Sequence, residues 1–267
     1  MKLKLLLSAV LGLVLLGSAF ADDLDEIKKR GTLIVGVKDA TPPFGMRNPK
    51  AKTISGYDVD FAIAIAKHLG VKVVVKEVES AQRIPRLQAK DVDLIIATMT
   101  KTAEREKQLD FSYGYFVTWQ KFAAPKGKIK TVEDLANANI GTVTGSTSEK
   151  HLRQELPGAN LVLFADYKQA FAALSNGELD AVSTEEPILA GRLGKMQNKD
   201  EFEIPDVSIS VEVYGIGVRK GEKRLLKEVN TTIVGMEESG EAEKIFDRWF
   251  GPSSQMPLLR TFKIGAK

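Results

Sequence analysis

The chain alternates short apolar runs with segments whose apolar residues recur at helical spacing. Residues 32–37 form a β-branched apolar run of buried-strand length, and residues 58–69 have helical spacing that ends at Gly70. The same signals predict strands over 71–78, 94–97, 140–143, 161–164 and 179–183, and helices over 25–30, 83–89, 103–108, 131–135, 148–156, 167–174, 223–236 and 240–249. Because strands alternate with helices, we predict an α/β fold with mostly parallel sheets.

The first 21 residues differ from the rest of the chain. Lys2 and Lys4 precede an apolar run over 5–16, and Ala19-Phe20-Ala21 has the small-x-small pattern of a cleavage site. The alternative is a membrane anchor, but the run is shorter than the roughly 20 apolar residues that span a bilayer. We therefore predict a cleaved signal peptide over 1–21 and export to the periplasm.

The predicted elements fall into two series, which meet near residues 125–127. Each series has a leucine, Leu87 or Leu174, six residues before an aspartate that leads into a strand. Two extended segments, 121–127 and 213–221, are suited to join two lobes, and clefts between lobes are favoured places for small ligands. We expect a discontinuous lobe 1 over 22–122 and 218–267, an inserted lobe 2 over 123–217, and crossover strands near 119–125 and 213–219.

Composition narrows the possible functions. The 267 residues carry a formal charge of +3 without a basic block, so we expect no nucleic-acid partner. The absence of cysteine excludes disulfides, thiolate metal sites and cysteine nucleophiles. His68 and His151 lie in helical segments without a catalytic or metal-ligand constellation, and no phosphate-binding loop is present. We expect no metal, no cofactor and no catalysis.

Several motifs follow one another in order over residues 24–255. They are GTLIVGV at 31–37, GYDVD at 56–60, TMTKTAER at 98–105, DFS at 110–112, GSTS at 145–148 and the helix over 240–249. With these motifs the chain resembles bacterial extracytoplasmic amino-acid-binding proteins of ABC importers. The resemblance implies the type II periplasmic binding protein fold, in which two lobes enclose a ligand cleft, and a monomer that delivers its ligand to an inner-membrane permease. The segment SAQRIP at 80–85 is similar to the glutamate/aspartate-binding branch.

An α-carboxylate needs positive charge and hydrogen-bond donors, because a buried unpaired charge is costly. Arg105 has the planar fork that suits a carboxylate, and Thr98 and Thr100 offer hydrogen bonds, although a solvated arginine fits the spacing alone. Ser146 and Thr147 open a helix whose N–H groups favour a carboxylate; Ser146 can equally cap that helix. The resemblance assigns these residues to the α-carboxylate.

The resemblance also implies where the rest of an amino acid binds. The family has an aspartate for the α-ammonium after the strand over 179–183; this chain has Glu185 there, with Glu186 as its neighbour. The family pattern for an acidic side chain is matched by Lys38, Ser80 and Arg83. Two aromatic residues are further candidates: Tyr167, which stands where some glutamate/aspartate binders have a histidine, and Phe44, which packs against the ligand or in the core.

The charges of these candidates favour an anionic ligand. Lys38, Arg83 and Arg105 against Glu185 leave an excess of two positive charges, so we predict a receptor for L-glutamate or L-aspartate that is not an enzyme. Glutamine is the neutral alternative. A prephenate-type dehydratase on the same fold, with Glu185 or Glu186 as proton donor, and an additional adhesin role remain open.

Overall fold

The computed structural model describes residues 22–254 and 256–265, so the predicted signal peptide lies outside the described residues. The helices are α1 (Asp23–Arg30), α2 (Tyr57–Leu69), α3 (Arg83–Gln88), α4 (Ala103–Glu106), α5 (Thr147–Glu155), α6 (Tyr167–Ser175), α7 (Glu186–Leu193), α8 (Lys223–Glu238) and α9 (Glu241–Phe250). The strands are β1 (Thr32–Val37), β2 (Ala40–Thr41), β3 (Gly45–Asn48), β4 (Thr53–Ser55), β5 (Lys72–Glu77), β6 (Leu94–Ile95), β7 (Leu109–Pro125), β8 (Asn139–Val143), β9 (Asn160–Phe164), β10 (Ala181–Glu185), β11 (Phe202–Glu203) and β12 (Ser210–Arg219). Three 3₁₀ turns complete the described elements: η1 (Ser80–Gln82), η2 (Val132–Leu135) and η3 (Lys199–Glu201).

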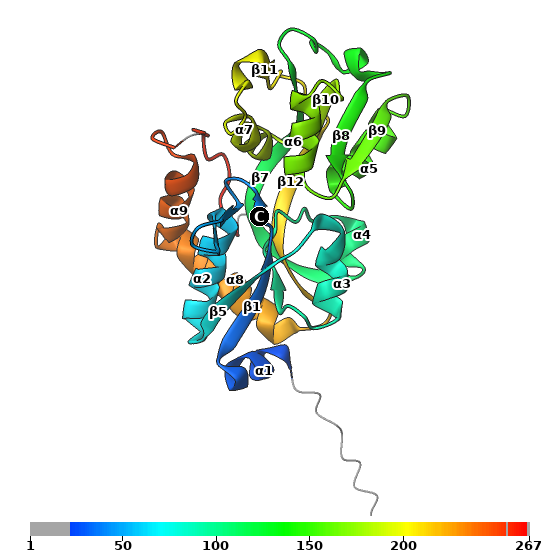
Figure 1. Ribbon diagram of the computed structural model, residues 1–267. Helices are drawn as coiled ribbons and strands as arrows, with labels where there is room; N and C mark the ends of the chain where they lie inside the picture. The colour runs from blue at the N-terminus through cyan, green and yellow to red at the C-terminus, as the bar shows by residue number, and fades with distance from the viewer. Residues whose placement is uncertain (1–21, 255, 266–267) are drawn as a thin grey trace, which may run out of the picture.

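Two lobes share one hydrogen-bonded sheet, whose main path is β5-β1-β6-β12-β7-β10-β8-β9. In lobe 1, β1 pairs in parallel with β5 and β6; in lobe 2, β8 pairs in parallel with β9 and β10. The long strands β7 and β12 pair antiparallel and pass from one lobe to the other (Figure 1). Helices flank both groups of strands, which confirms the predicted α/β two-lobe fold.

The local signals in the sequence explain most of these elements. Asp22 caps α1 by accepting a hydrogen bond from the backbone N–H of Leu24, and Gly31 ends that helix with a φ of 67° that glycine adopts without strain. Thr131 and Asp134 form a capping box around η2. The predicted helices and strands are therefore present, with ends that differ by a few residues, except that the helix expected over 131–135 is the 3₁₀ turn η2.

Three features differ from the sequence prediction. The expected loop over 39–45 contains β2 and the start of β3, which pair in a separate three-stranded sheet with β4. Helix α7 was not predicted, because its eight residues follow β10 directly and give little periodic signal. Strand β7 is 17 residues long, although only its end was expected to be extended. The predicted crossover segment 119–125 lies at the end of β7 that pairs with β10 of lobe 2. The predicted segment 213–219 lies on the part of β12 that pairs with β6 and with residues 109–117 of β7, toward lobe 1.

An aromatic cluster fills lobe 1 directly below the cleft. Phe44 is fully buried, and its ring centroid lies 4.9 Å from that of Phe116 and 5.4 Å from that of Tyr214. Tyr57 and Phe250 pack against the same ring. Of the two alternatives for Phe44, the structure therefore supports core packing.

Replacing Phe44 with alanine is expected to lower the free energy of unfolding by about 3 to 5 kcal/mol, because a large buried ring is lost and its cavity relaxes only in part. Urea unfolding followed by circular dichroism measures this change. The matched control is Val74→Ala on β5, whose side chain is 43% exposed and whose loss should be about 0.5 kcal/mol. Equal losses in the two variants would contradict the buried position of Phe44.

Candidate functional site

The candidate residues gather where strands of the two lobes end. Lys38 follows β1, Thr98 follows β6, and Glu185 is the last residue of β10. The carboxyl ends of parallel strands are the usual location of ligand sites in open α/β sheets. Thr147 begins α5 after β8 and faces Thr100 of lobe 1, with 3.3 Å between the hydroxyl oxygens. The fold thus brings residues from both series of elements to one cleft.

Two arginines of lobe 1 reach the same carbonyl group of lobe 2. Nη2 of Arg105 donates to the Gly145 carbonyl at 3.1 Å, and Nη2 of Arg83 donates to it at 3.3 Å. Nη1 of Arg105 also donates to the Thr100 carbonyl at 2.9 Å. A Lys150–Glu104 ion pair at 2.6 Å joins the lobes farther out. The lobes are therefore in contact across the cleft, in a closed arrangement.

Most N–H donors of Arg83 are engaged by the backbone. The side chain is buried, Nε donates to the Ser80 carbonyl, and Nη1 donates to the carbonyls of Ala97 and Thr98, each at 3.0 Å. Burial and the nearby Arg105 guanidinium lower the pKa of Arg83 to about 9. Arg83 therefore supplies charge to the cleft, but most of its donors shape the cleft wall.

Thr98 is held in a strained backbone conformation at this wall. Its φ is 46°, a region that a β-branched residue rarely adopts, at a cost of about 1–3 kcal/mol. Its N–H donates to Oδ2 of the buried Asp58 at 3.0 Å, while the Tyr115 hydroxyl donates to Oδ1 at 2.7 Å. Burial outweighs these hydrogen bonds and raises the pKa of Asp58 to about 7.

Ser146 and Thr147 have different roles. The Ser146 hydroxyl caps α5: it accepts a hydrogen bond from the Glu149 N–H at 3.1 Å and donates to the Val143 carbonyl at 2.6 Å. Thr147 is buried, and its hydroxyl donates to Oε2 of Glu212 at 3.0 Å. Helix capping thus accounts for the Ser146 side chain, and Thr147 faces the cleft.

Glu185 and Glu186 point to different surroundings. Glu185 is buried; burial and the neighbouring Glu212 charge raise its pKa. Lys38 is among the groups that act on its charge. Glu186 is half-buried and instead accepts a hydrogen bond from the Lys121 ammonium at 3.1 Å. Of the two glutamates, Glu185 is the one associated with the cleft.

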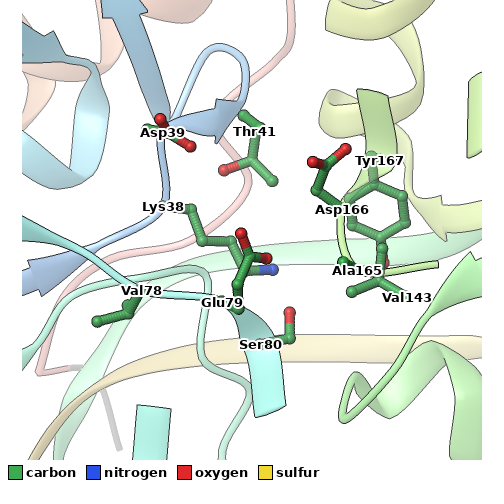
Figure 2. A pocket seen from close by; sticks show the side chains of 11 residues that line it. Lys38, Asp39, Thr41, Val78, Glu79, Ser80, Val143, Ala165, Asp166 and Tyr167 are labelled. Carbon is green, nitrogen blue, oxygen red and sulfur yellow. The ribbon is translucent and has the colours of Figure 1, made fainter. Parts of the chain in front are cut away.

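A small cavity between the lobes is lined by Lys38, Ser80 and Tyr167, together with Glu79 and Asp166 (Figure 2). The Lys38 ammonium lies 5.6 Å from the centroid of the Tyr167 ring. Burial and repulsion by Arg83 lower the pKa of Lys38 to about 7. The free volume of this cavity is only about 10 Å³, which is room for about one water molecule. An amino acid therefore enters this region only if the lobes separate.

Sequence reasoning missed two buried carboxylates of this cleft, Asp58 and Glu212. Asp58 lies in the GYDVD motif but was not assigned to the site. Glu212 lies in an extended segment, where no motif marks it as a site residue. With these two acids, the set of Lys38, Arg83, Arg105 and Glu185 becomes three bases and three carboxylates. The expected excess of two positive charges therefore omitted two buried acids.

Comparison with known proteins agrees with this two-lobe architecture. Residues 33–252 match the family described as bacterial extracellular solute-binding proteins, family 3. The ABC transporter glutamine-binding protein GlnH of Bacillus subtilis is 40% identical over 233 residues, which cover 85% of this chain and 84% of that protein. The L-glutamate/L-aspartate-binding protein of Pseudomonas aeruginosa is 32% identical over 263 residues, with 92% and 87% covered.

A solved structure of an ancestral arginine-binding protein bound to glutamine superposes with a TM-score of 0.79 at 40% identity, covering 83% of this chain and 99% of that one. The fold and the cleft thus define a two-lobe binding protein. The chain belongs to family 3 of the bacterial extracellular solute-binding proteins. Among the residues that the structure describes, none of the helices has the length and apolar character needed to cross a membrane.

The raised pKa of Asp58 predicts a pH dependence of stability. The folded protein binds the Asp58 proton more tightly than the unfolded chain does. The stability that this proton contributes is therefore fully present below the ordinary Asp pKa of 3.8 and is lost as pH rises through about 7. Asp58→Asn, which has no such proton, should gain stability relative to the wild type as pH rises from 4 toward 7. Urea unfolding of both proteins across this range measures the difference, and parallel curves would refute the assignment.

Proposed function

We propose that this chain is a periplasmic receptor that binds a free L-amino acid between its lobes and delivers it to an ABC import permease in the inner membrane. The ligand that the site favours is a neutral polar amino acid, with glutamine first. The observation that carries this choice is the balance of buried charge: Lys38, Arg83 and Arg105 against Asp58, Glu185 and Glu212. A glutamine zwitterion has no net charge and preserves this balance, whereas glutamate adds an uncompensated negative charge. The higher identity to a glutamine-binding relative supports the same choice.

Each part of the ligand has a matching group. Arg105 has N–H donors beyond those given to the Thr100 and Gly145 carbonyls, and the α-carboxylate would take them. Glu185 is the partner for the α-ammonium. The side-chain amide extends toward the cavity at Lys38 and Ser80, where the buried Ser80 hydroxyl has no hydrogen-bond partner among the described residues. An amide, which both donates and accepts, suits such a hydroxyl.

Ligand contacts to both lobes would favour the closed arrangement, which is a population shift about the crossover strands. Arg105 then exchanges part of its contact with Gly145 for the ligand carboxylate. The proposed lobe boundaries, 22–122 with 218–267 and 123–217, place both crossovers on β7 and β12. The signal peptide over 1–21 is the proposed route to the periplasm.

L-Glutamate or L-aspartate is the second candidate, and one observation favours it. The Lys38 ammonium lies at the cavity against the Tyr167 ring. Its lowered pKa means that the neighbouring carboxylates do not fully offset the cost of burying its positive charge. A ligand side-chain carboxylate would provide that compensation. In this case binding draws a proton onto Lys38.

Calorimetry on ligand-stripped protein tests the proposed function directly. We expect L-glutamine to bind at least about 10-fold more tightly than L-glutamate, because the extra buried charge costs more than about 1.4 kcal/mol. L-Arginine and L-lysine should bind weakly or not at all, and incubation with prephenate should leave its absorbance unchanged. Tight glutamate binding with weak glutamine binding would support the second candidate, and prephenate turnover would support the dehydratase alternative. If none of these amino acids binds, the proposed function is wrong.

Lys38→Met separates the two ligand classes, because it keeps much of the side-chain volume and removes the charge. For an acidic ligand, the wild-type affinity should fall as pH rises above about 7, where Lys38 loses its proton. The variant should then bind glutamate at least about 10-fold more weakly and without this pH slope. For glutamine, which places an uncharged amide at Lys38, the affinity should fall less than it does for glutamate, and its pH profile should change little. Calorimetry at pH 6, 7 and 8 measures both outcomes.

A further inference from the structure

Glu212 is a fully buried carboxylate on the crossover strand β12, at the point where the two lobes meet. Its Oε2 accepts a hydrogen bond from the Thr147 hydroxyl at 3.0 Å. Its Oε1 accepts one from the Ser210 hydroxyl at 2.7 Å and lies 3.2 Å from Nδ1 of His151. Burial alone would raise the pKa of Glu212, but hydrogen bonds with His151, Thr100 and Ser210 lower it below its ordinary value. Glu212 therefore remains an ionised, acceptor-only group.

This carboxylate fixes the direction of a chain of hydroxyl groups. A threonine hydroxyl has one proton, and the Thr147 hydroxyl donates that proton to Glu212. The contact of 3.3 Å between the hydroxyl oxygens of Thr147 and Thr100 is then made by the Thr100 proton. Both protons point toward Glu212, which leaves each hydroxyl oxygen with lone pairs for other partners. The remaining lone pairs of the Thr100 and Thr147 hydroxyls can therefore only accept, which differs from the donor role toward an α-carboxylate that the resemblance implies for these side chains.

Two other buried hydroxyls at this cleft differ from this pair. Thr98 Oγ1 and Ser80 Oγ have no hydrogen-bond partner within residues 22–254 and 256–265, so their protons are not committed. Uncommitted protons suit the acceptor oxygens of a carboxylate or a side-chain amide. The hydroxyls therefore divide into an acceptor pair, Thr100 and Thr147, and a donor-capable pair, Thr98 and Ser80.

We propose that Glu212 is a positioning residue that selects ligands with an α-ammonium group, by orienting the Thr100 and Thr147 hydroxyls as acceptors and by placing a permanent negative charge behind them. This inference rests on the proposed function, because it assumes that an amino acid occupies the cleft. It assigns the ammonium two kinds of support: the direct partner Glu185, and the acceptor pair that Glu212 orients. An α-hydroxy acid has no positive charge and gains much less from this arrangement.

The test compares each amino acid with the analogue that carries a hydroxyl in place of the ammonium: L-glutamine with its 2-hydroxy analogue, and L-glutamate with L-2-hydroxyglutarate. The quantity measured is the ratio of the two affinities, by calorimetry or by competition. A general loss of folded or closed protein weakens both ligands equally and cancels in this ratio. Thermal unfolding of each variant gives an independent check of folding.

Glu212→Gln should lower the ratio at least about 10-fold, since it removes the negative charge that strengthens the interaction with the ammonium. The ratio should fall in either orientation of the new glutamine amide. With the amide oxygen toward Thr147, only the negative charge is lost. With the amide nitrogen toward Thr147, the direction of the hydroxyl hydrogen bonds is reversed as well. An unchanged ratio in Glu212→Gln would overturn the inference.

Substitutions of threonine supply the matched controls. Thr147→Val removes an acceptor and should lower the ratio, whereas Thr147→Ser keeps the hydroxyl and should restore it. Thr98→Val removes a donor that both ligands would use through their carboxylates, so it should weaken both and leave the ratio unchanged. Equal ratios in Thr147→Val and the wild type, or a lowered ratio in Thr98→Val alone, would contradict the division of hydroxyls. Wild-type protein that binds neither amino acid would instead refute the proposed function.

Discussion

The antiparallel pairing of β7 with β12 is the interaction on which the two-lobe structure depends. Its register runs from Ser210 opposite Gln120 to Arg219 opposite Leu109, and it joins the parallel strands of lobe 1 to those of lobe 2. The register shifts between Tyr214 and Gly217, and such irregularities bend a strand locally. At this place a Cβ on Gly215 would lie 2.8 Å from the Lys101 side chain. The two strands therefore hold the lobes together, and under the proposed function they are where the relative orientation of the lobes would change.

This pairing also explains which parts of the fold the sequence could predict. Strand β1 and the capped turn η2 depend on neighbours a few residues away, and their residues carried clear local signals. Strands β7 and β12 depend on partners about a hundred positions away, and polar residues such as Gln120 and Glu212 interrupt their apolar pattern. Those residues can be buried because their polar atoms have hydrogen-bond partners. Gln120, for example, donates to the Ser148 carbonyl and the Ser183 hydroxyl. A period-2 pattern assigns such residues to solvent, so the full length of the strands was not visible.

The same distinction applies to the cleft. Arg105, Thr100 and Thr147 lie in recognisable motifs at the starts of helices or the ends of strands, and the structure brings them together. The carboxylates that determine the charge of the cleft are held by partners distant in sequence: Asp58 by Thr98, 40 residues away, and Glu212 by Thr147, 65 residues away. A charge count over motifs alone therefore included the bases and omitted two of the acids. Because buried charges must be paired, the omitted acids are the reason that the proposed ligand is neutral rather than acidic.

The balance of charge in the cleft also resists changes of protonation. Burial brings the pKa of Lys38 down to about 7 and that of Asp58 up to about 7, so a base and an acid lose their charges together when one proton moves from Lys38 to Asp58. The net charge is the same before and after that transfer, and Arg83 and Arg105 continue to face Glu185 and Glu212. For these six groups the net charge is therefore the same in either protonation state, and the proposed neutral ligand would preserve it. Under the proposed function, an acidic ligand would bring one further proton with it, and the energy of that proton, rather than the shape of the side-chain pocket, would separate glutamine from glutamate.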